Sequence, residues 1–219
     1  ISEDPDPSKE TSIFWHIPKS GGTTAKSVAH CLDKATHVAS DVFSWEGAWE
    51  DGAITSGKWA GDVVFSSMPS HAVMGLFQGT HRKGRMLAMF RHPIDRLISK
   101  FYYIQVATWE NSYRPDLRGM DIVDWATDVN VDDNHLVNRL AGNLNRKMAD
   151  EGQLQLAMAT VRKYFIVGLM SEMDESIRRF NKVMGIDGSD LGCALGHSNS
   201  NSHPKVSCSL SLILVLNDL

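Results

Sequence analysis

The sequence predicts an α/β fold in which a central parallel sheet carries helices on both faces. Four short apolar segments rich in β-forming residues lie at 12–17, 62–67, 85–90 and 164–169, and amphipathic helical segments alternate with them. Strands that are apolar along their whole length are typical of a parallel sheet covered on both sides. With 219 residues, 42% of them hydrophobic, the chain is long enough for one domain with a full core.

The first predicted unit is a strand, a glycine turn and a helix. The strand SIFWHI (12–17) stops at Pro18, and TAKSVAHCL (24–32) has the apolar spacing of a helix. Thr23 or Thr24 is expected near the helix N-cap, where hydroxyl side chains are favoured.

The second and third units are shorter. Residues 40–60 carry three tryptophans among Gly, Glu and Asp, and we expect them to be irregular. The strand DVVFSS (62–67) follows, and then MPSHAVMGL (68–76), which we interpret as a turn bearing His71. The third strand, RMLAMF (85–90), leads into a further helix.

The remaining elements complete the alternation. The fourth strand is YFIVGL (164–169). The predicted helices after the third strand lie at 95–107, 121–128, 132–141, 152–163 and 174–184.

Composition divides the chain into three parts. Residues 1–11 are acidic and contain two prolines, which is typical of a flexible lead-in or stalk and not of a signal peptide. Residues 12–186 form the predicted domain. Residues 187–219 are first small and polar and then apolar, and we expect an edge strand or a disordered end. No apolar run is long enough to span a membrane.

The three cysteines have no metal-ligand spacing. Cys31 lies in an apolar helical pattern, so we expect a buried thiol. Cys193 and Cys208 are close enough in sequence for one disulfide, although two unpaired thiols in a loose tail fit the sequence equally well.

Residues after three of the predicted strands suggest an anion site. Carboxyl ends of parallel strands meet at one edge of a sheet, which gathers the glycine turn, His71 and Arg91 there. The net charge is −4, so such a site depends on local clustering, and nucleic-acid binding has little support.

The glycine turn lies within FWHIPKSGGTT, residues 14–24. Gly21 and Gly22 allow a ligand close to the backbone, and the N–H groups at the helix start favour an anion. Lys19 adds a charge, and the two threonines add hydroxyl donors. The nucleotide-binding pattern G-x-x-x-x-G-K-[ST] does not match, because no lysine follows Gly22.

A second motif is FRHPIDRLISKFYY, residues 90–103. Arg91 ends a strand and Ser99 lies in the following helix, and an arginine fork with a serine hydroxyl suits a phosphate monoester. The alternative is a local surface ion pair between Arg91 and Asp95.

Together these two motifs resemble those of sulfotransferases that use 3′-phosphoadenosine 5′-phosphosulfate (PAPS). HIPKSGG and RHPIDRLISKFYY are most similar to the Golgi carbohydrate branch, which includes the heparan and dermatan 2-O-sulfotransferases. DNHLVNRLAGN (133–143) and LAMATVRKYFIVGLMSEMDESIRRF (156–180) resemble later segments of that branch. The resemblance therefore covers most of residues 12–185.

The resemblance implies a P-loop-like sheet and a set of site residues. Arg91 and Ser99 match the pair that holds the 3′-phosphate, and Lys19 would also neutralise the oxygen from which sulfate departs. The resemblance implies no metal. It also implies a location in the Golgi lumen, as part of a membrane-anchored parent chain. The 5′-phosphosulfate loop matches Lys19, Ser20, Gly21, Gly22, Thr23 and Thr24.

Sulfuryl transfer to a hydroxyl also requires a base. We choose His71, which follows the second strand in a position similar to the His-Gly-His segment of the family. This sequence departs from that segment with Pro-Ser-His at 69–71. His81 and Glu46 are the other candidates, and His16 is interpreted as a structural residue that holds the turn.

The predicted function is thus PAPS-dependent O-sulfation of a carbohydrate hydroxyl. The alternatives are a P-loop kinase-like phosphotransferase, for which no acidic Mg²⁺ ligand stands out, and an inactive nucleotide-binding module. Acceptor-binding loops are expected at 43–59 and 105–120, although their tryptophans fit core packing equally well.

Overall fold

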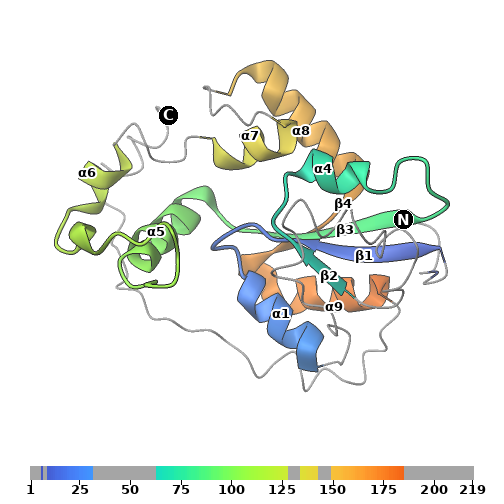
Figure 1. Cartoon of the computed structure of the whole chain (residues 1–219), viewed down its shortest axis with the longest axis horizontal. Coiled ribbons are helices and arrows are strands. Elements are labelled where there is room, and N and C mark those ends of the chain that lie inside the picture. The colour runs from blue at the N-terminus through green and yellow to red at the C-terminus, as the bar shows by residue number, and fades with distance from the viewer. Residues whose placement is uncertain (1–5, 7–8, 32–62, 128–133, 143–148, 185–219) are drawn as a thin grey trace.

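The predicted α/β fold is confirmed by a computed structural model, which describes residues 6, 9–31, 63–127, 134–142 and 149–184 (Figure 1). Its four strands pair only in parallel, in the order β2-β1-β3-β4. The strands are β1 (Glu10–Trp15), β2 (Val63–Ser66), β3 (Lys83–Phe90) and β4 (Phe165–Leu169).

All four predicted strands are present, and the first begins earlier than expected. Glu10 and Thr11 pair with Lys83 and Gly84, which extends the sheet by two residues at its amino-terminal edge. The strand ends at Trp15, although the N–H of His16 still donates to the carbonyl of Ser66 at 2.7 Å.

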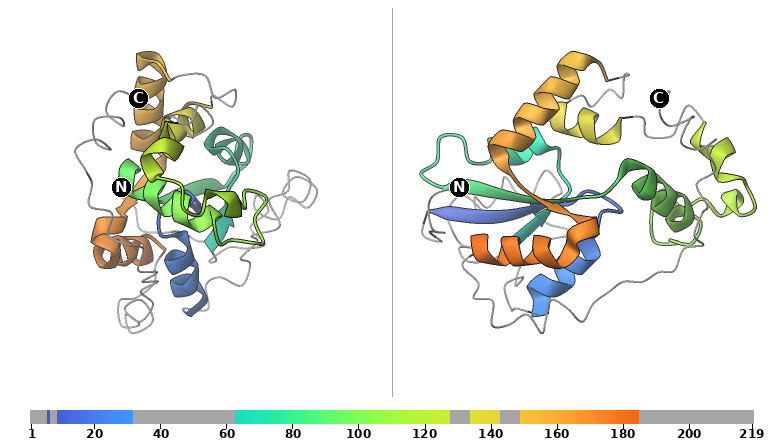
Figure 2. Two further views of the ribbon diagram at one scale, coloured as in Figure 1. Left: turned by 90° about the vertical axis from the view of Figure 1, so that its left-hand side faces the viewer. Right: turned by 180° about the vertical axis from the view of Figure 1, so that it is seen from behind.

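Helices cover both faces of the sheet (Figures 1 and 2). Along β1, Ile13 and Trp15 pack into one hydrophobic cluster while Phe14 packs into another, as the two-residue repeat of a strand requires. The first cluster lies under α4 (Ser70–Gly75), α7 (His135–Ala141) and α8 (Glu151–Tyr164); the second lies under α1 (Gly22–Cys31) and α9 (Met173–Val183).

A third group of elements extends past the carboxyl edge of the sheet. Helix α5 (Pro93–Ile104), the short η1 (Pro115–Leu117) and α6 (Ile122–Ala126) lie there (Figure 2) and share a small core around Phe101 and Trp125. A 3-10 turn, η2 (Met170–Glu172), joins β4 to α9. Across the described ranges, no helix has the length and apolar character needed to cross a membrane.

Two local predictions are wrong. Residues 68–76 contain α4 and not only a turn, because Pro69 suits the position before a helix and Ala72 and Val73 are buried in the core. Helix α1 begins at Gly22, earlier than the predicted segment 24–32, and Thr23 and Thr24 lie in its first turn, near the N-cap as expected.

The second wrong prediction concerns Cys31, which is exposed and disulfide-bonded and is not a buried thiol. The predictions for Cys193 and Cys208, for residues 40–60 and for 187–219 lie outside the described residues.

Candidate anion-binding site

The order of the strands places the switch point of the sheet between β1 and β3. From β1 the chain moves to β2 on one side, and it then returns to β3 on the other, so the loops that leave β1 and β3 run in opposite directions. In open parallel sheets, ligands bind outside the carboxyl ends of the strands at such a point. The glycine loop follows β1 and Arg91 follows β3, so both lie at this switch point.

The backbone of the loop adopts two left-handed conformations. Gly21 has φ +83°, which glycine accepts without cost, and Lys19 has φ +67°, which is unfavourable for a residue with a Cβ. The turn closes where the N–H of Ser20 donates to the carbonyl of Ile17 at 3.3 Å. Strain of this kind concentrates at functional sites.

Gly22 starts α1 directly against the ring of His16. A Cβ at Gly22 would stand 2.2 Å from Cδ2 of that ring, so only glycine fits. The ring is held on its other side by a hydrogen bond between Nδ1 and the hydroxyl of Ser67 at 3.3 Å. This agrees with a structural role for His16 in the turn.

The surroundings of His16 are strongly cationic. The pKa of its imidazole is lowered to about 4, first by burial and then by the charges of Lys26, Arg139 and Lys19, against the opposite effect of Glu110. A local positive field thus exists at the loop although the whole chain carries a net charge of −4.

Ser20 has a buried hydroxyl without a partner. The residue is 1% exposed, and among the described residues its Oγ makes no hydrogen bond. An unpaired buried hydroxyl is costly unless a ligand satisfies it. Ser20 is therefore the loop residue whose hydroxyl a ligand atom would satisfy.

The two sequence motifs are in direct contact. Nη1 of Arg91 donates to the carbonyl of Lys19 at 3.1 Å. Burial lowers the pKa of Arg91, and the charge of Asp95 opposes that effect. The predicted alternative, an Arg91–Asp95 salt bridge, is not present among the described contacts.

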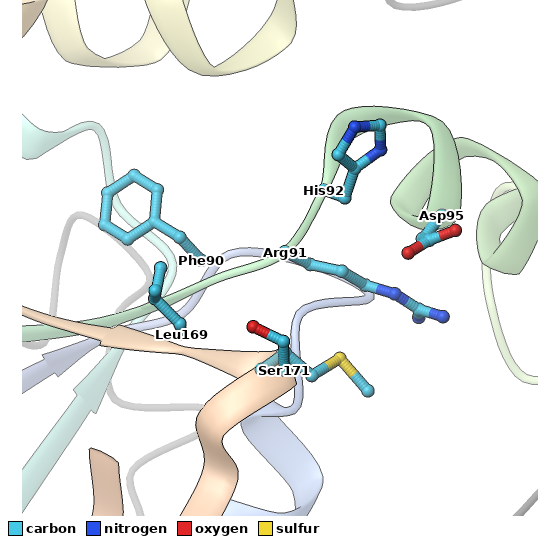
Figure 3. Close-up of a pocket in the computed structure, with 7 residues that line it drawn as sticks. Phe90, Arg91, His92, Asp95, Leu169 and Ser171 are labelled. Carbon is cyan, nitrogen blue, oxygen red and sulfur yellow. The ribbon is translucent and has the colours of Figure 1, made fainter. Parts of the chain in front are cut away.

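Arg91 also lines a pocket at the carboxyl ends of β3 and β4. The pocket has a volume of about 540 Å³. Figure 3 shows the side chain of Arg91 extending to the same side as Asp95, with Phe90 and Leu169 on the other side of the view. The lining residues are Phe90, Arg91, His92, Asp95, Leu169, Met170 and Ser171.

The side chain of Lys19 rests on an aromatic ring. Its Nζ lies 3.4 Å from the centroid of Tyr103, and the hydroxyl of Tyr103 donates to Oε1 of Glu110 at 2.7 Å. Burial lowers the pKa of Lys19; Arg91 adds to this effect and Glu110 opposes it. Sequence reasoning missed the roles of Tyr103 and Glu110, although the former stands in the FYY end of the second motif.

The remaining predicted residues are placed as follows. Ser99 is buried in α5 and makes no recorded hydrogen bond to Arg91. His71 is exposed on α4, where its ring lies beside Gly142: a Cβ on that glycine would stand 3.4 Å from its Nδ1. His81 precedes the amino-terminal end of β3, opposite the edge that carries the loop, and Glu46 lies outside the described residues.

Comparison with known protein families, curated proteins and solved structures found no match for this chain.

Proposed function

We propose that this chain is a PAPS-dependent O-sulfotransferase that transfers a sulfuryl group to a carbohydrate hydroxyl. The single observation that carries the proposal is the hydrogen bond from Arg91 to the carbonyl of Lys19. It joins the two motifs of the sequence at the switch point of the sheet, where a ligand with phosphates at both its 5′ and 3′ ends could contact both motifs.

The loop is suited to the 5′ end of that ligand, in a P-loop-like arrangement. Ser20 offers a buried hydroxyl that has no hydrogen-bond partner among the described residues. The N–H groups that begin α1 favour an anion, and Thr23 and Thr24 lie in that first turn.

The pocket beside Arg91 is suited to the 3′ end. Its volume of about 540 Å³ falls in the range of small-molecule sites. The guanidinium supplies the charge for a phosphate, and its partly buried position strengthens that interaction. Ser99, two turns into α5, is proposed as the second 3′-phosphate residue on the family resemblance.

Two side chains carry the chemistry. When bound, PAPS supplies a sulfuryl group whose bond to a phosphate oxygen breaks as the bond to the acceptor oxygen forms, leaving adenosine 3′,5′-bisphosphate. The Lys19 ammonium stabilises negative charge near the loop, where partial burial makes it more effective than in water. An imidazole nitrogen of His71 takes the proton of the acceptor hydroxyl, and its exposure leaves room for that acceptor.

The proposed location is the Golgi lumen, in a membrane-anchored parent. The disulfide at Cys31 supports an oxidising compartment, because such bonds are rare in reducing ones.

Ligand binding separates this proposal from the kinase-like alternative. We expect PAPS and adenosine 3′,5′-bisphosphate each to raise the melting temperature, whereas ATP with Mg²⁺ does not. Stabilisation by ATP–Mg²⁺ alone would overturn the proposal.

Catalysis is tested by transfer of radiolabelled sulfate to a panel of glycans. His71→Ala should abolish transfer, whereas His81→Ala, at the other edge of the sheet, should leave it intact. Equal rates of sulfate transfer in the wild type and His71→Ala would exclude His71 as the general base. A wild type that binds PAPS and transfers nothing to any glycan would favour the inactive module.

A further inference from the structure

The ammonium of Lys19 lies against an aromatic ring at the end of the second motif. Tyr103 is the penultimate residue of α5, far from the loop in sequence, and its ring centroid is 3.4 Å from Nζ of Lys19. At this distance the cation sits on the negative face of the ring, which attracts it. The contact joins the loop after β1 to the helix after β3 a second time, beside the bond from Arg91.

The ring of Tyr103 is itself fixed. Its hydroxyl donates to Glu110 at 2.7 Å, and its edge meets the indole of Trp109 with centroids 6.3 Å apart. The carbonyl of Tyr103 accepts from the N–H of Ala107 at 3.0 Å, which anchors the backbone at the end of the helix. The ring is therefore a rigid support for a flexible lysine.

We propose that Tyr103, held by Glu110, positions the Lys19 ammonium for the departing oxygen. This inference rests on the proposed function, since it concerns the same lysine. The backbone end of Lys19 is fixed by its left-handed φ and by Arg91, and the ammonium end is fixed by Tyr103. With both ends fixed, the side chain loses little freedom when an anion binds.

The contact with Tyr103 still allows the Lys19 ammonium to bind a ligand. An ammonium has three N–H donors, and the ring covers only one side of it. Among the described residues, no hydrogen bond or ion pair uses these donors, so they are available to ligand oxygens. The charged groups that act on Lys19 are Arg91, which disfavours its charged form, and Glu110, which favours it. The carboxylate that holds the ring therefore also supports the charge of the lysine.

The contact can be measured without any ligand. Lysine amines are converted to ¹³C-dimethylamines, which keep their charge, and Lys19→Arg identifies the Lys19 signal. A methyl group over an aromatic face is shifted upfield. We expect that shift in the wild type and in Tyr103→Phe, and its loss in Tyr103→Leu. Tyr102→Leu is the matched control, since Tyr102 is the neighbouring residue in the helix and its ring packs edge to face with Phe101.

The consequence for function is measured separately on the same variants. Tyr103→Leu should weaken binding of adenosine 3′,5′-bisphosphate and lower kcat for sulfate transfer, each about 3- to 20-fold. Tyr103→Phe should stay within about twofold of the wild type. A loss confined to KM for the glycan acceptor, with kcat unchanged, would overturn the positioning role.

The two proposals fail in different ways. A wild type without the upfield signal overturns the inference, even if Tyr103→Leu does not fold. Equal losses in Tyr103→Leu and Tyr102→Leu also overturn it, because they would reflect packing alone. If the upfield signal depends on Tyr103 but no PAPS analogue binds the wild type, the proposed function fails while the Lys19–Tyr103 contact stands.

Discussion

Replacing Gly22 by alanine tests the tightest contact of the loop. The new Cβ would stand 2.2 Å from Cδ2 and 2.5 Å from Nε2 of His16, whereas carbon atoms pack at about 3.5–4.0 Å. The ring must therefore move by roughly 1–2 Å, which breaks its hydrogen bond to Ser67. Overpacking costs about 1–3 kcal/mol, and alanine in a helix regains about 0.5–1 kcal/mol. We expect a net loss of about 1 kcal/mol in the free energy of unfolding.

The displaced ring gives a second, independent readout. Burial is the largest cause of the low pKa of His16, about 4 against a usual 6.5. A ring that moves toward water should titrate closer to 6.5. Proton NMR of the histidine C–H signals in Gly22→Ala measures this change directly.

A double-mutant cycle isolates the clash. Urea unfolding is measured for Gly22→Ala, His16→Ala and the double variant. Without the ring, Gly22→Ala should be neutral or stabilising, which gives a coupling energy of about 1–2 kcal/mol. Gly75→Ala is the control, because a Cβ there meets no atom within 4 Å and its effect should not depend on His16. A Gly22→Ala cost that persists in the His16→Ala background would refute the reasoning.

Three further predictions follow from the same contacts. The pKa of His16 is about 4 in the folded chain against about 6.5 when unfolded, so the unfolded chain binds more protons between pH 4 and 6.5. The free energy of unfolding should therefore be at its full value above pH 6.5 and fall by up to about 3 kcal/mol toward pH 4. His16→Ala should flatten this part of a pH profile measured by urea unfolding. Gly168→Ala places a Cβ 2.7 Å from Phe180 in the core, and should lower the free energy of unfolding by about 1–3 kcal/mol; an unchanged urea midpoint would contradict the packing. Arg91→Ala removes the donor to the Lys19 carbonyl and should weaken binding of adenosine 3′,5′-bisphosphate, measured by calorimetry, by about 10- to 100-fold; a loss below about threefold would contradict its role.

The sheet could be predicted because both of its faces are buried. Neighbouring residues such as Phe14 and Trp15 pack into different clusters, so the buried part of a central strand is a continuous apolar run that stands out in the sequence. The position of Arg91 beside the loop followed from the rule for carboxyl ends of parallel strands. The contact with Lys19 makes that expectation specific.

Predictions from the local sequence were wrong or incomplete where contacts with residues far away in the sequence determine the structure. The α4 segment looks like a turn because Pro69 and Ser70 begin it, yet burial of Val73 in the core favours a helix. Cys31 has the periodicity of a buried residue, but it ends α1 and its disulfide is not visible in a helical pattern. No local pattern links Tyr103 to Lys19, because this contact depends on the loop after β1 meeting helix α5.

The bond from Arg91 to the Lys19 carbonyl also sets how many donors a ligand finds. A guanidinium carries five N–H donors, and the carbonyl occupies one of them. Four remain, enough for both oxygens of a phosphate without releasing the loop. Arg91 can thus hydrogen-bond to the loop and to an anion at the same time. Lysine at position 91 would have three donors on a single nitrogen and no planar fork. It could therefore not bond to the loop carbonyl and bind a phosphate through two oxygens in the same geometry.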